Sequence, residues 1–147
     1  MEIAVLGLGC FWGPEIKFSK VSGVIKTEVG YCGGNTKETT YEEVCTGKTN
    51  HAEVVKLDFD PKIISYEKIL EYFFEIHDST TLNSQGPDFG TQYRSEIFYL
   101  NDKQKKIANE VLDKENIKLS KKVVTKISLL KNYCAAEEYH QKYLEKR

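Results

Sequence analysis

The chain has 147 residues, of which 40% are hydrophobic and 29% charged, and 21 basic residues against 22 acidic ones give a formal net charge of −1. This length suits a single domain over residues 1–147 with a buried core, so a disulfide framework is not required. The balanced charge excludes the basic excess typical of proteins that bind nucleic acid or anionic lipid.

No segment has the pattern of a membrane span or a secretory signal. The longest uncharged stretch, Ile3–Pro14, is much shorter than the roughly 18 apolar residues of a spanning helix, and no Lys or Arg precedes it. We expect a cytoplasmic protein whose cysteines are thiols. The cysteines form neither a CxxC pair nor a zinc-type doublet, so no metal or cofactor is predicted; they are Cys10, Cys32, Cys45 and Cys134.

The first half of the chain predicts a strand, a helix and two further strands. Glu2–Leu8 is a short apolar run that ends at turn residues, which is typical of a buried strand. Pro14 begins a helix that extends to Lys20, because proline is favoured in the first helical turn. Val24–Tyr31 is a second strand, and Glu53–Phe59 alternates in the way of a half-buried strand.

The second half predicts helices and strands in alternation. Ser65 is a helix cap, and the apolar residues that follow it recur at helical spacing as far as His77. The further predicted elements are a strand over Ser95–Leu100, a charged helix after Asn101, a strand over Lys122–Leu130 and a final helix over Ala135–Leu144.

This order of elements indicates an α+β fold. Strand, helix, strand, strand, helix, strand is the split βαβ, or ferredoxin-like, arrangement: two layers with a mixed sheet, here extended by a C-terminal helix, strand and helix. One connection, Asp78–Arg94, is too long for a plain loop in a compact domain. Loops of this length are commonly functional.

Cys10 lies between the first strand and the first helix, beside Phe11 and Trp12. Unsatisfied N–H groups and the positive end of the helix dipole favour an anion there. Because an ordinary thiol has a pKa of about 8.5, this position favours a reactive thiolate. The alternative is an inert buried cysteine among core aromatics, and spacing alone does not decide between the two.

Six blocks of sequence resemble the A-type methionine sulfoxide reductases, in the same order and over nearly the whole chain. They are Gly9–Glu15, Gly30–Gly34, Tyr41–Gly47, His51–Val55, Asp88–Ser95 and Ala136–Gln141. The resemblance implies an enzyme of protein repair under oxidative stress, a peptide-methionine (S)-S-oxide reductase. Its substrate would be the S epimer of methionine sulfoxide, free or in proteins.

The resemblance also implies roles for single residues. Cys10 attacks the sulfoxide sulfur and becomes a sulfenic acid, and Phe11 and Trp12 form the hole for the S-methyl group. Glu53 protonates the oxygen, which requires a carboxylic acid kept neutral by apolar surroundings. Tyr41 and Tyr93 donate hydrogen bonds to the oxygen. The remaining matches are Asp88, which holds the substrate backbone and water, and two structural histidines, His51 and His140.

The sulfenic acid must be reduced again. Many relatives carry resolving cysteines in a glycine-rich tail after the last block, and no such tail follows it here, so we expect an external thiol such as glutathione with glutaredoxin, or thioredoxin. Resolution by a second cysteine of the chain remains open. The pattern predicts Cys45 buried in a helix over Tyr41–Gly47, Cys32 exposed in a glycine-rich loop and Cys134 at a helix entry. Some relatives have selenocysteine at the nucleophile, so that origin of position 10 is open too.

Two other functions fit parts of the pattern. A thiol peroxidase would also use a cysteine near a helix start, but it would need neither the aromatic hole nor a protonated Glu53. A non-catalytic module could bind methionine-containing peptides in an aromatic groove. Reduction of each sulfoxide epimer by the wild type and by Cys10→Ser distinguishes these alternatives.

Overall fold

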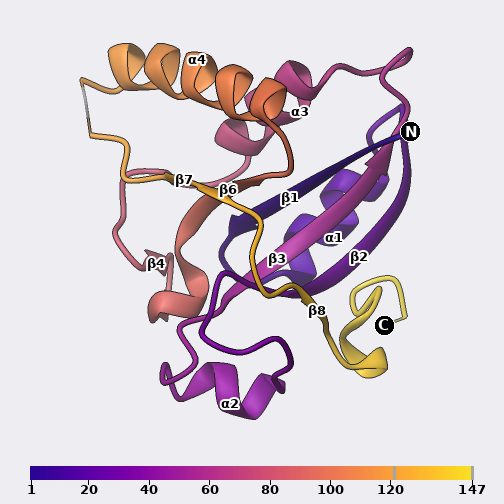
Figure 1. The fold of residues 1–147 in the computed structure, drawn as a ribbon, viewed down its shortest axis with the longest axis vertical. Coiled ribbons are helices and arrows are strands. Elements are labelled where there is room, and N and C mark those ends of the chain that lie inside the picture. Colours follow the sequence, from indigo (N-terminus) through magenta and orange to yellow (C-terminus); the bar gives the residue numbers. More distant parts are fainter. Residues whose placement is uncertain (121, 147) are drawn as a thin grey trace.

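The computed structural model describes residues 1–120 and 122–146, and its centre is a six-stranded mixed sheet with the strand order β7-β6-β1-β3-β2-β8 (Figure 1). The strands of this sheet are β1 (Glu2–Leu8), β2 (Val24–Cys32), β3 (Ala52–Phe59), β6 (Ser95–Tyr99), β7 (Lys126–Leu129) and β8 (Cys134–Ala135). The α-helices are α1 (Trp12–Ser19), α2 (Tyr41–Cys45), α3 (Tyr66–Glu75) and α4 (Asp102–Lys118). The short strands β4 (Ser84–Gln85) and β5 (Asp88–Phe89) pair separately.

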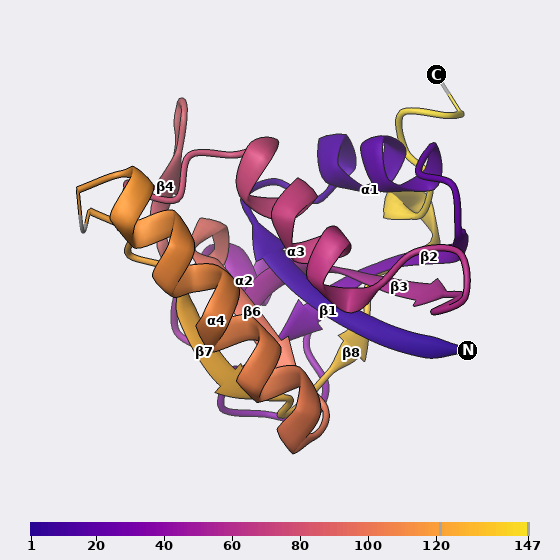
Figure 2. The ribbon, with the colours of Figure 1, turned by 90° about the horizontal axis from the view of Figure 1, so that it is seen from above.

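The split βαβ core is confirmed. Its four strands lie in the order β6-β1-β3-β2, and α1 and α3 make the two crossings. In Figure 2, α1 and α3 lie on the same side of β1, and α4 runs beside α3. The predicted extension is confirmed for its helix α4 and its strand β7, which pairs with β6 in parallel.

The two faces of the sheet bury different residues, because successive side chains of a strand point to opposite faces. Leu6 faces the helices and joins one core with Phe18 of α1 and Phe73 of α3. Val5 faces the other way and packs with Phe98. All are at most 1% exposed, and full burial of such a side chain is worth roughly 1.5–3 kcal/mol. The sheet is therefore a rigid base for the segments at its ends.

Side-chain caps fix where three of the helices begin. Thr40, Ser65 and Asn101 each accept a hydrogen bond from the backbone N–H three residues later, which satisfies a donor that the helix leaves free. The predicted starts of α3 and α4 are thus confirmed. The first helix begins at Trp12, earlier than the predicted Pro14.

The predicted final helix over Ala135–Leu144 is wrong. This segment contains the end of β8, a 3-10 helix η2 (Glu138–His140) and turns. The Gln141 amide accepts from Val29 N at 2.9 Å and donates to Val29 O at 2.9 Å, and Lys142 has a φ of 52°. Long-range bonds of this kind outweigh local helix propensity.

The connection 78–94 is ordered and lies against the end of β1. The Gln85 side chain bonds the backbone of Asp78, and Arg94 Nε donates to Glu96 Oε1 at 2.6 Å. Gly9 has a φ of 99°, and a Cβ there would lie 2.9 Å from Gln85 Cβ. Only glycine permits both the backbone conformation and this close approach, which brings the connection beside Cys10.

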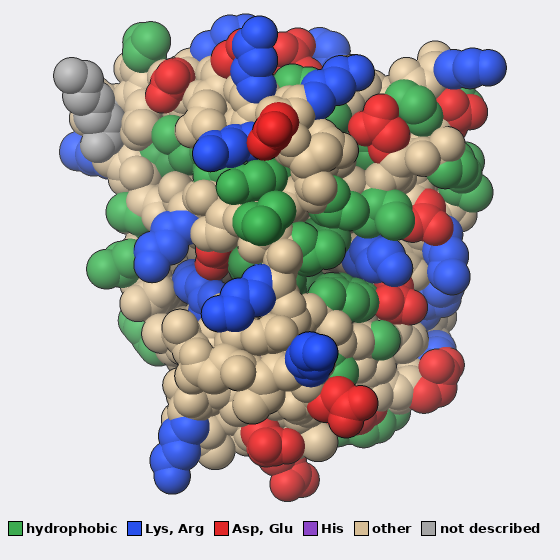
Figure 3. Space-filling view, viewed as in Figure 1, with side chains coloured by type: hydrophobic (Ala, Val, Ile, Leu, Met, Phe, Trp, Pro, Cys, Tyr) green, Lys and Arg blue, Asp and Glu red, His purple; other side chains and the backbone are tan. Residues whose placement is uncertain are grey.

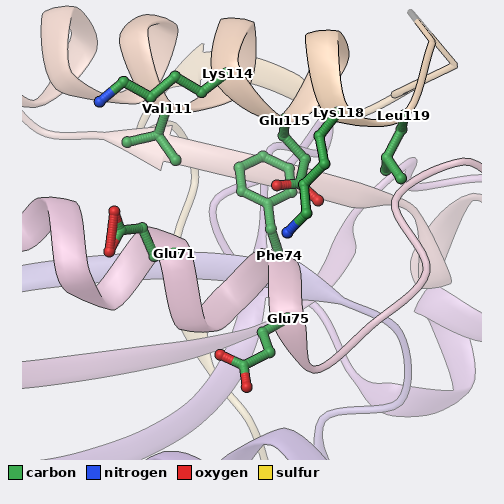
Figure 4. Close-up of a pocket in the computed structure, with 8 residues that line it drawn as sticks. All are labelled: Glu71, Phe74, Glu75, Val111, Lys114, Glu115, Lys118 and Leu119. Carbon is green, nitrogen blue, oxygen red and sulfur yellow. The ribbon is translucent and has the colours of Figure 1, made fainter.

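The cavity between the two long helices lies away from the predicted site residues. Lysine and arginine side chains alternate with acidic ones on the face shown in Figure 3. A cavity of about 550 Å³ lies between α3 and α4, with Phe74 and Val111 among its lining residues (Figure 4). None of the predicted site residues lines this cavity. Among the described helices, none is long and apolar enough to cross a membrane.

Candidate active site

Strand direction brings the predicted residues to one end of the sheet. Because β1 is antiparallel to both β3 and β6, its last residues meet the first residues of those strands; Leu8, for example, pairs with Ser95. Cys10 follows β1, Glu53 begins β3, and Tyr93 ends the 3-10 helix η1 (Thr91–Tyr93) just before β6. Figure 1 shows α2 and the β4–β5 hairpin at this same end.

Cys10 is a half-buried thiol rather than a resting thiolate. Loss of hydration on burial raises its pKa to about 11, and the charges of Glu53 and Asp88 act in the same direction. The hydrogen bond from the Trp12 backbone N–H to the sulfur lowers the pKa, but by less. The predicted stabilisation of the thiolate by the helix start is therefore present. The prediction of a thiolate at neutral pH is wrong, because the effect of burial on the pKa is larger than the effect of the helix start.

Glu53 is a buried carboxyl with one free oxygen. It is 1% exposed; Oε1 accepts from the Phe11 backbone N–H at 3.3 Å, and Oε2 has no hydrogen-bond partner within the described residues. Burial raises the pKa of Glu53 to about 8, against the opposing effect of the Phe11 bond. At neutral pH most of this carboxyl is protonated, and among residues 1–120 and 122–146 its Oε2 has no hydrogen-bond partner.

Two phenols and a carboxylate complete the polar part of the site. Tyr41 and Tyr93 lie close enough to act electrostatically on each other. Burial raises the pKa of Tyr93 to about 12 and that of Tyr41 further, so both are neutral donors at physiological pH. Asp88 lies close enough to act electrostatically on Cys10, Glu53 and Tyr93.

The aromatic side of the site depends on the C-terminal segment. Phe11 is 1% exposed, and its ring lies 5.4 Å from that of His140. Trp12 is half-buried, stacks on Tyr143 at 3.8 Å between ring centroids, and donates from Nε1 to His140 Nδ1 at 3.1 Å. Tyr41 is 4.6 Å from the same histidine ring. Sequence reasoning missed Tyr143 and underrated His140, although the block Ala136–Gln141 was the available signal.

The other cysteines differ from their predicted exposure. Cys32 is fully buried and donates to Lys131 O at 3.3 Å, because residues 131–133 cover the loop that was expected to be open. Cys45 is exposed, because the five-residue α2 projects from the sheet, and it lies one helical turn after Tyr41. Cys134 is half-buried in β8 rather than at a helix entry.

The other predicted structural histidine, His51, has a backbone partner. His51 is buried, and its Nε2 lies 2.9 Å from Thr36 O.

Within the described ranges, no group of three or more His, Cys, Asp or Glu side chains could hold a metal ion. A half-buried thiol, a neutral carboxylic acid with a free oxygen and two neutral phenols are the groups that a cysteine-dependent enzyme with a general acid requires.

Comparison with known proteins identifies the family. The family model for peptide methionine sulfoxide reductase matches residues 2–147. The peptide methionine sulfoxide reductase MsrA of Pelagibacter ubique (strain HTCC1062) is 82% identical over 147 residues, which covers all of both chains. The chain belongs to the peptide methionine sulfoxide reductase family, and it is an enzyme that reduces methionine sulfoxide to methionine.

Solved structures agree with this assignment. Mxr1 from Saccharomyces cerevisiae in its reduced form superposes with a TM-score of 0.95 at 40% identity, covering 99% of this chain and 85% of that one. Mxr1 in complex with Trx2 gives a TM-score of 0.69 at 26% identity, covering 97% of this chain and 84% of that one. The predicted fold class and enzyme class are confirmed.

Proposed function

We propose that Cys10 attacks the sulfur of the S epimer of methionine sulfoxide while Glu53 protonates the oxygen. The observation that carries this proposal is the Glu53 carboxyl, which is buried, is protonated at neutral pH and has no partner for Oε2 in the described part of the chain. A sulfoxide oxygen leaves sulfur only when it gains a proton, so a neutral acid beside the nucleophile supplies what the step lacks.

The proton balance selects one form of the Cys10–Glu53 pair. The reaction converts the thiol and the sulfoxide into a sulfenic acid and a thioether. One oxygen atom passes from the substrate sulfur to the Cys10 sulfur, and two electrons pass the other way. The step consumes one proton, which the Cys10–Glu53 pair supplies. The reactive form carries that proton on Glu53 and leaves Cys10 as the thiolate. The S–O bond of the substrate breaks, the Cys10 sulfur gains the oxygen, and methionine departs.

The neighbouring side chains hold the substrate. Tyr41 and Tyr93 donate hydrogen bonds that strengthen as negative charge develops on the oxygen. Phe11 and Trp12 receive the S-methyl group; the half-buried Trp12 offers the more accessible ring, fixed by Tyr143 and His140. Asp88 binds the substrate backbone and an active-site water.

The reductant of the sulfenic acid is a thiol protein from outside the chain. The complex of the related Mxr1 with Trx2 supports a thioredoxin-type protein in preference to glutathione with glutaredoxin. We also propose a cytoplasmic location, because a reducing compartment keeps the free cysteines of this chain as thiols. Cell fractionation tests the location.

Single-turnover mass spectrometry tests the chemistry. The purified enzyme is mixed with one equivalent of each methionine sulfoxide epimer, without reductant. The wild type should convert the S epimer, and the peptide with Cys10 should gain one oxygen or a bond derived from it. Cys10→Ser should leave the substrate intact, and Glu53→Gln should slow conversion at least 100-fold, a typical contribution of a general acid. Conversion by Cys10→Ser at the wild-type rate would refute the proposal.

A further inference from the structure

Glu137 connects two elements of the site through one carboxylate. It lies just after β8 and is half-buried. Its Oε1 accepts from the Tyr31 hydroxyl of β2 at 2.8 Å, and its Oε2 accepts from the backbone N–H of Tyr41, the first residue of α2, at 3.0 Å. The mechanism proposed above gives Glu137 no task.

The bond to Tyr41 holds a short helix in place. The helix α2 has five residues, of which Val44 is buried, and a helix of this length is not stable by itself. Its first N–H has no acceptor within the helix, and a carboxylate there forms a charge-assisted hydrogen bond. Glu137 therefore fixes the backbone that carries the Tyr41 phenol.

The bond to Tyr31 ties that helix to the pair of strands that carries the acid. Tyr31 is fully buried, and it is the direct partner of Glu53 in the antiparallel pairing of β2 with β3. Its ring also lies 5.7 Å from that of Phe11. The connection through Glu137 thus sets where the Tyr41 phenol lies relative to Glu53.

The Glu137 side chain is ionised in the folded protein. Burial favours its neutral form, but hydrogen bonds from the backbone N–H of Tyr41, from its own N–H and from the Tyr31 hydroxyl outweigh burial and lower the pKa of Glu137. At neutral pH the carboxylate therefore has two acceptor oxygens, one for each of the two elements.

We propose that Glu137 is a positioning residue, which holds Tyr41 where its phenol can bond the sulfoxide oxygen beside Glu53. This inference rests on the proposed role of Tyr41 as a donor to that oxygen. Glu137 acts through Tyr41 and not on the substrate directly.

A double-mutant cycle tests the inference. The variants are Glu137→Met, Tyr41→Phe and both together, measured with the S epimer and dithiothreitol. Glu137→Met removes both acceptors, so kcat should fall about 10-fold, near the lower end of what hydrogen bonds to a charged group contribute. KM should change little, because the bond from Tyr41 strengthens only in the transition state. In the Tyr41→Phe background, Glu137→Met should have no further effect, since the hydroxyl that it positions is gone.

The conservative variant Glu137→Gln should restore kcat. Its amide oxygen can accept from the Tyr41 N–H while its amide nitrogen donates to the Tyr31 hydroxyl. Tyr31→Phe keeps the core filled and removes only the bond to β2, so it should show part of the loss of kcat.

Two variants of the same segment serve as controls. Gln141→Met removes the bonds to Val29 and none to Tyr41, so its effect on kcat should be the same in the wild-type and Tyr41→Phe backgrounds. Glu138→Gln changes an exposed side chain next to Glu137 and should leave kcat unchanged.

The outcomes separate this inference from the function that it rests on. Wild-type kcat in Glu137→Met, an equal loss in both backgrounds, or Glu137→Gln as slow as Glu137→Met would overturn the positioning role, while a slow Tyr41→Phe variant still supports the role of Tyr41. Wild-type kcat in Tyr41→Phe would overturn both roles. If Glu137→Met does not fold, Tyr31→Phe decides, and wild-type kcat in that variant would overturn the positioning role.

Discussion

Among single residues, burial sets the acid–base chemistry of the site. It raises the pKa of Glu53 to about 8 and that of Cys10 to about 11, because each charged form would lose its hydration. The two groups also repel when both are ionised, so the two values belong to the pair. The pair loses its first proton near pH 8 and its second near pH 11.

The first prediction concerns the pH dependence of kcat/KM. The reactive form of the pair carries one proton, whereas at pH 6 most molecules carry two. Activity should therefore rise about tenfold per pH unit toward pH 8, level off above it, and fall as the second proton leaves near pH 11. Initial rates check this profile, measured with enough dithiothreitol at each pH that its thiolate never limits the rate.

Glu53→Gln is the matched control, because it has the same shape without the ionisation. Its residual activity should lose the inflection near pH 8. A wild-type rate that falls steadily from pH 6 to pH 9 would contradict the shared-proton form and favour a reaction that uses the doubly protonated pair.

That these candidate residues meet at one end of the sheet could be predicted from sequence, but their protonation states could not. Cys10, Glu53 and Tyr93 lie at the ends of strands that their local patterns already indicated. The pKa of Cys10, however, depends on its burial and on the charge of Asp88 in the connection 78–94, and the approach of that connection leaves no room for a Cβ at Gly9 beside Gln85. No periodicity in the sequence encodes such a contact.

At the level of elements, the C-terminal segment replaces a helix with side-chain hydrogen bonds. Glu137 accepts from the Tyr31 hydroxyl at 2.8 Å and from Tyr41 N, and Gln141 bonds both backbone groups of Val29. The run Ala-Ala-Glu-Glu-Tyr-His-Gln favours a helix locally. Its polar side chains have partners on β2 and α2 instead, and sequence reasoning had no access to them.

The second prediction concerns this attachment. Gln141→Met keeps an unbranched side chain of similar length but leaves the Val29 N–H and C=O without the amide. The free energy of unfolding should fall by about 1–3 kcal/mol, as measured by urea denaturation. Activity should fall as well, because the same segment holds His140 and Tyr143 against Trp12.

Glu138→Gln provides the comparison for that variant, since it lies in the same segment with a side chain that is 91% exposed. It should change stability by less than about 0.5 kcal/mol. Equal stability of Gln141→Met and wild type would show that water replaces the amide bonds without cost.

For the whole molecule, the buried Glu53 carboxyl is expected to lower the free energy of unfolding at neutral pH. The unfolded chain ionises Glu53 near its ordinary pKa of 4.5, while the folded protein keeps the proton up to about pH 8. The unfolded state therefore binds fewer protons between these values, and stability falls as pH rises through this window. Below pH 4.5 both states are protonated and the loss vanishes.

The third prediction follows from this linkage. At pH 7 the free energy of unfolding of Glu53→Gln should exceed that of the wild type by about 3 kcal/mol. This gain in stability should shrink toward pH 4.5. Urea denaturation at pH 5, 7 and 8 measures it. Glu38→Gln, at an exposed position, should show no such trend. A gain that is independent of pH would exclude ionisation as its source.

The order of strands and helices was predictable because each element satisfies its own pattern. The apolar run of β1, the alternation in β3, the caps of α3 and α4, and the apolar spacing in α3 are all local signals. The chain topology then follows from short connections. The hairpin β4–β5 and the path after β8 depend on distant partners, which explains why they were not predicted.

The Gln141 amide also bears on self-association. A sheet edge offers a row of N–H and C=O groups to which a second copy could add a strand. On the outer side of β2, residues 30 and 31 pair with the two-residue β8, and Val29 is held by an amide that mimics a backbone neighbour. An incoming strand would have to displace both β8 and the Gln141 amide. This edge of the sheet is therefore protected against fibre growth by the Gln141 side chain together with β8.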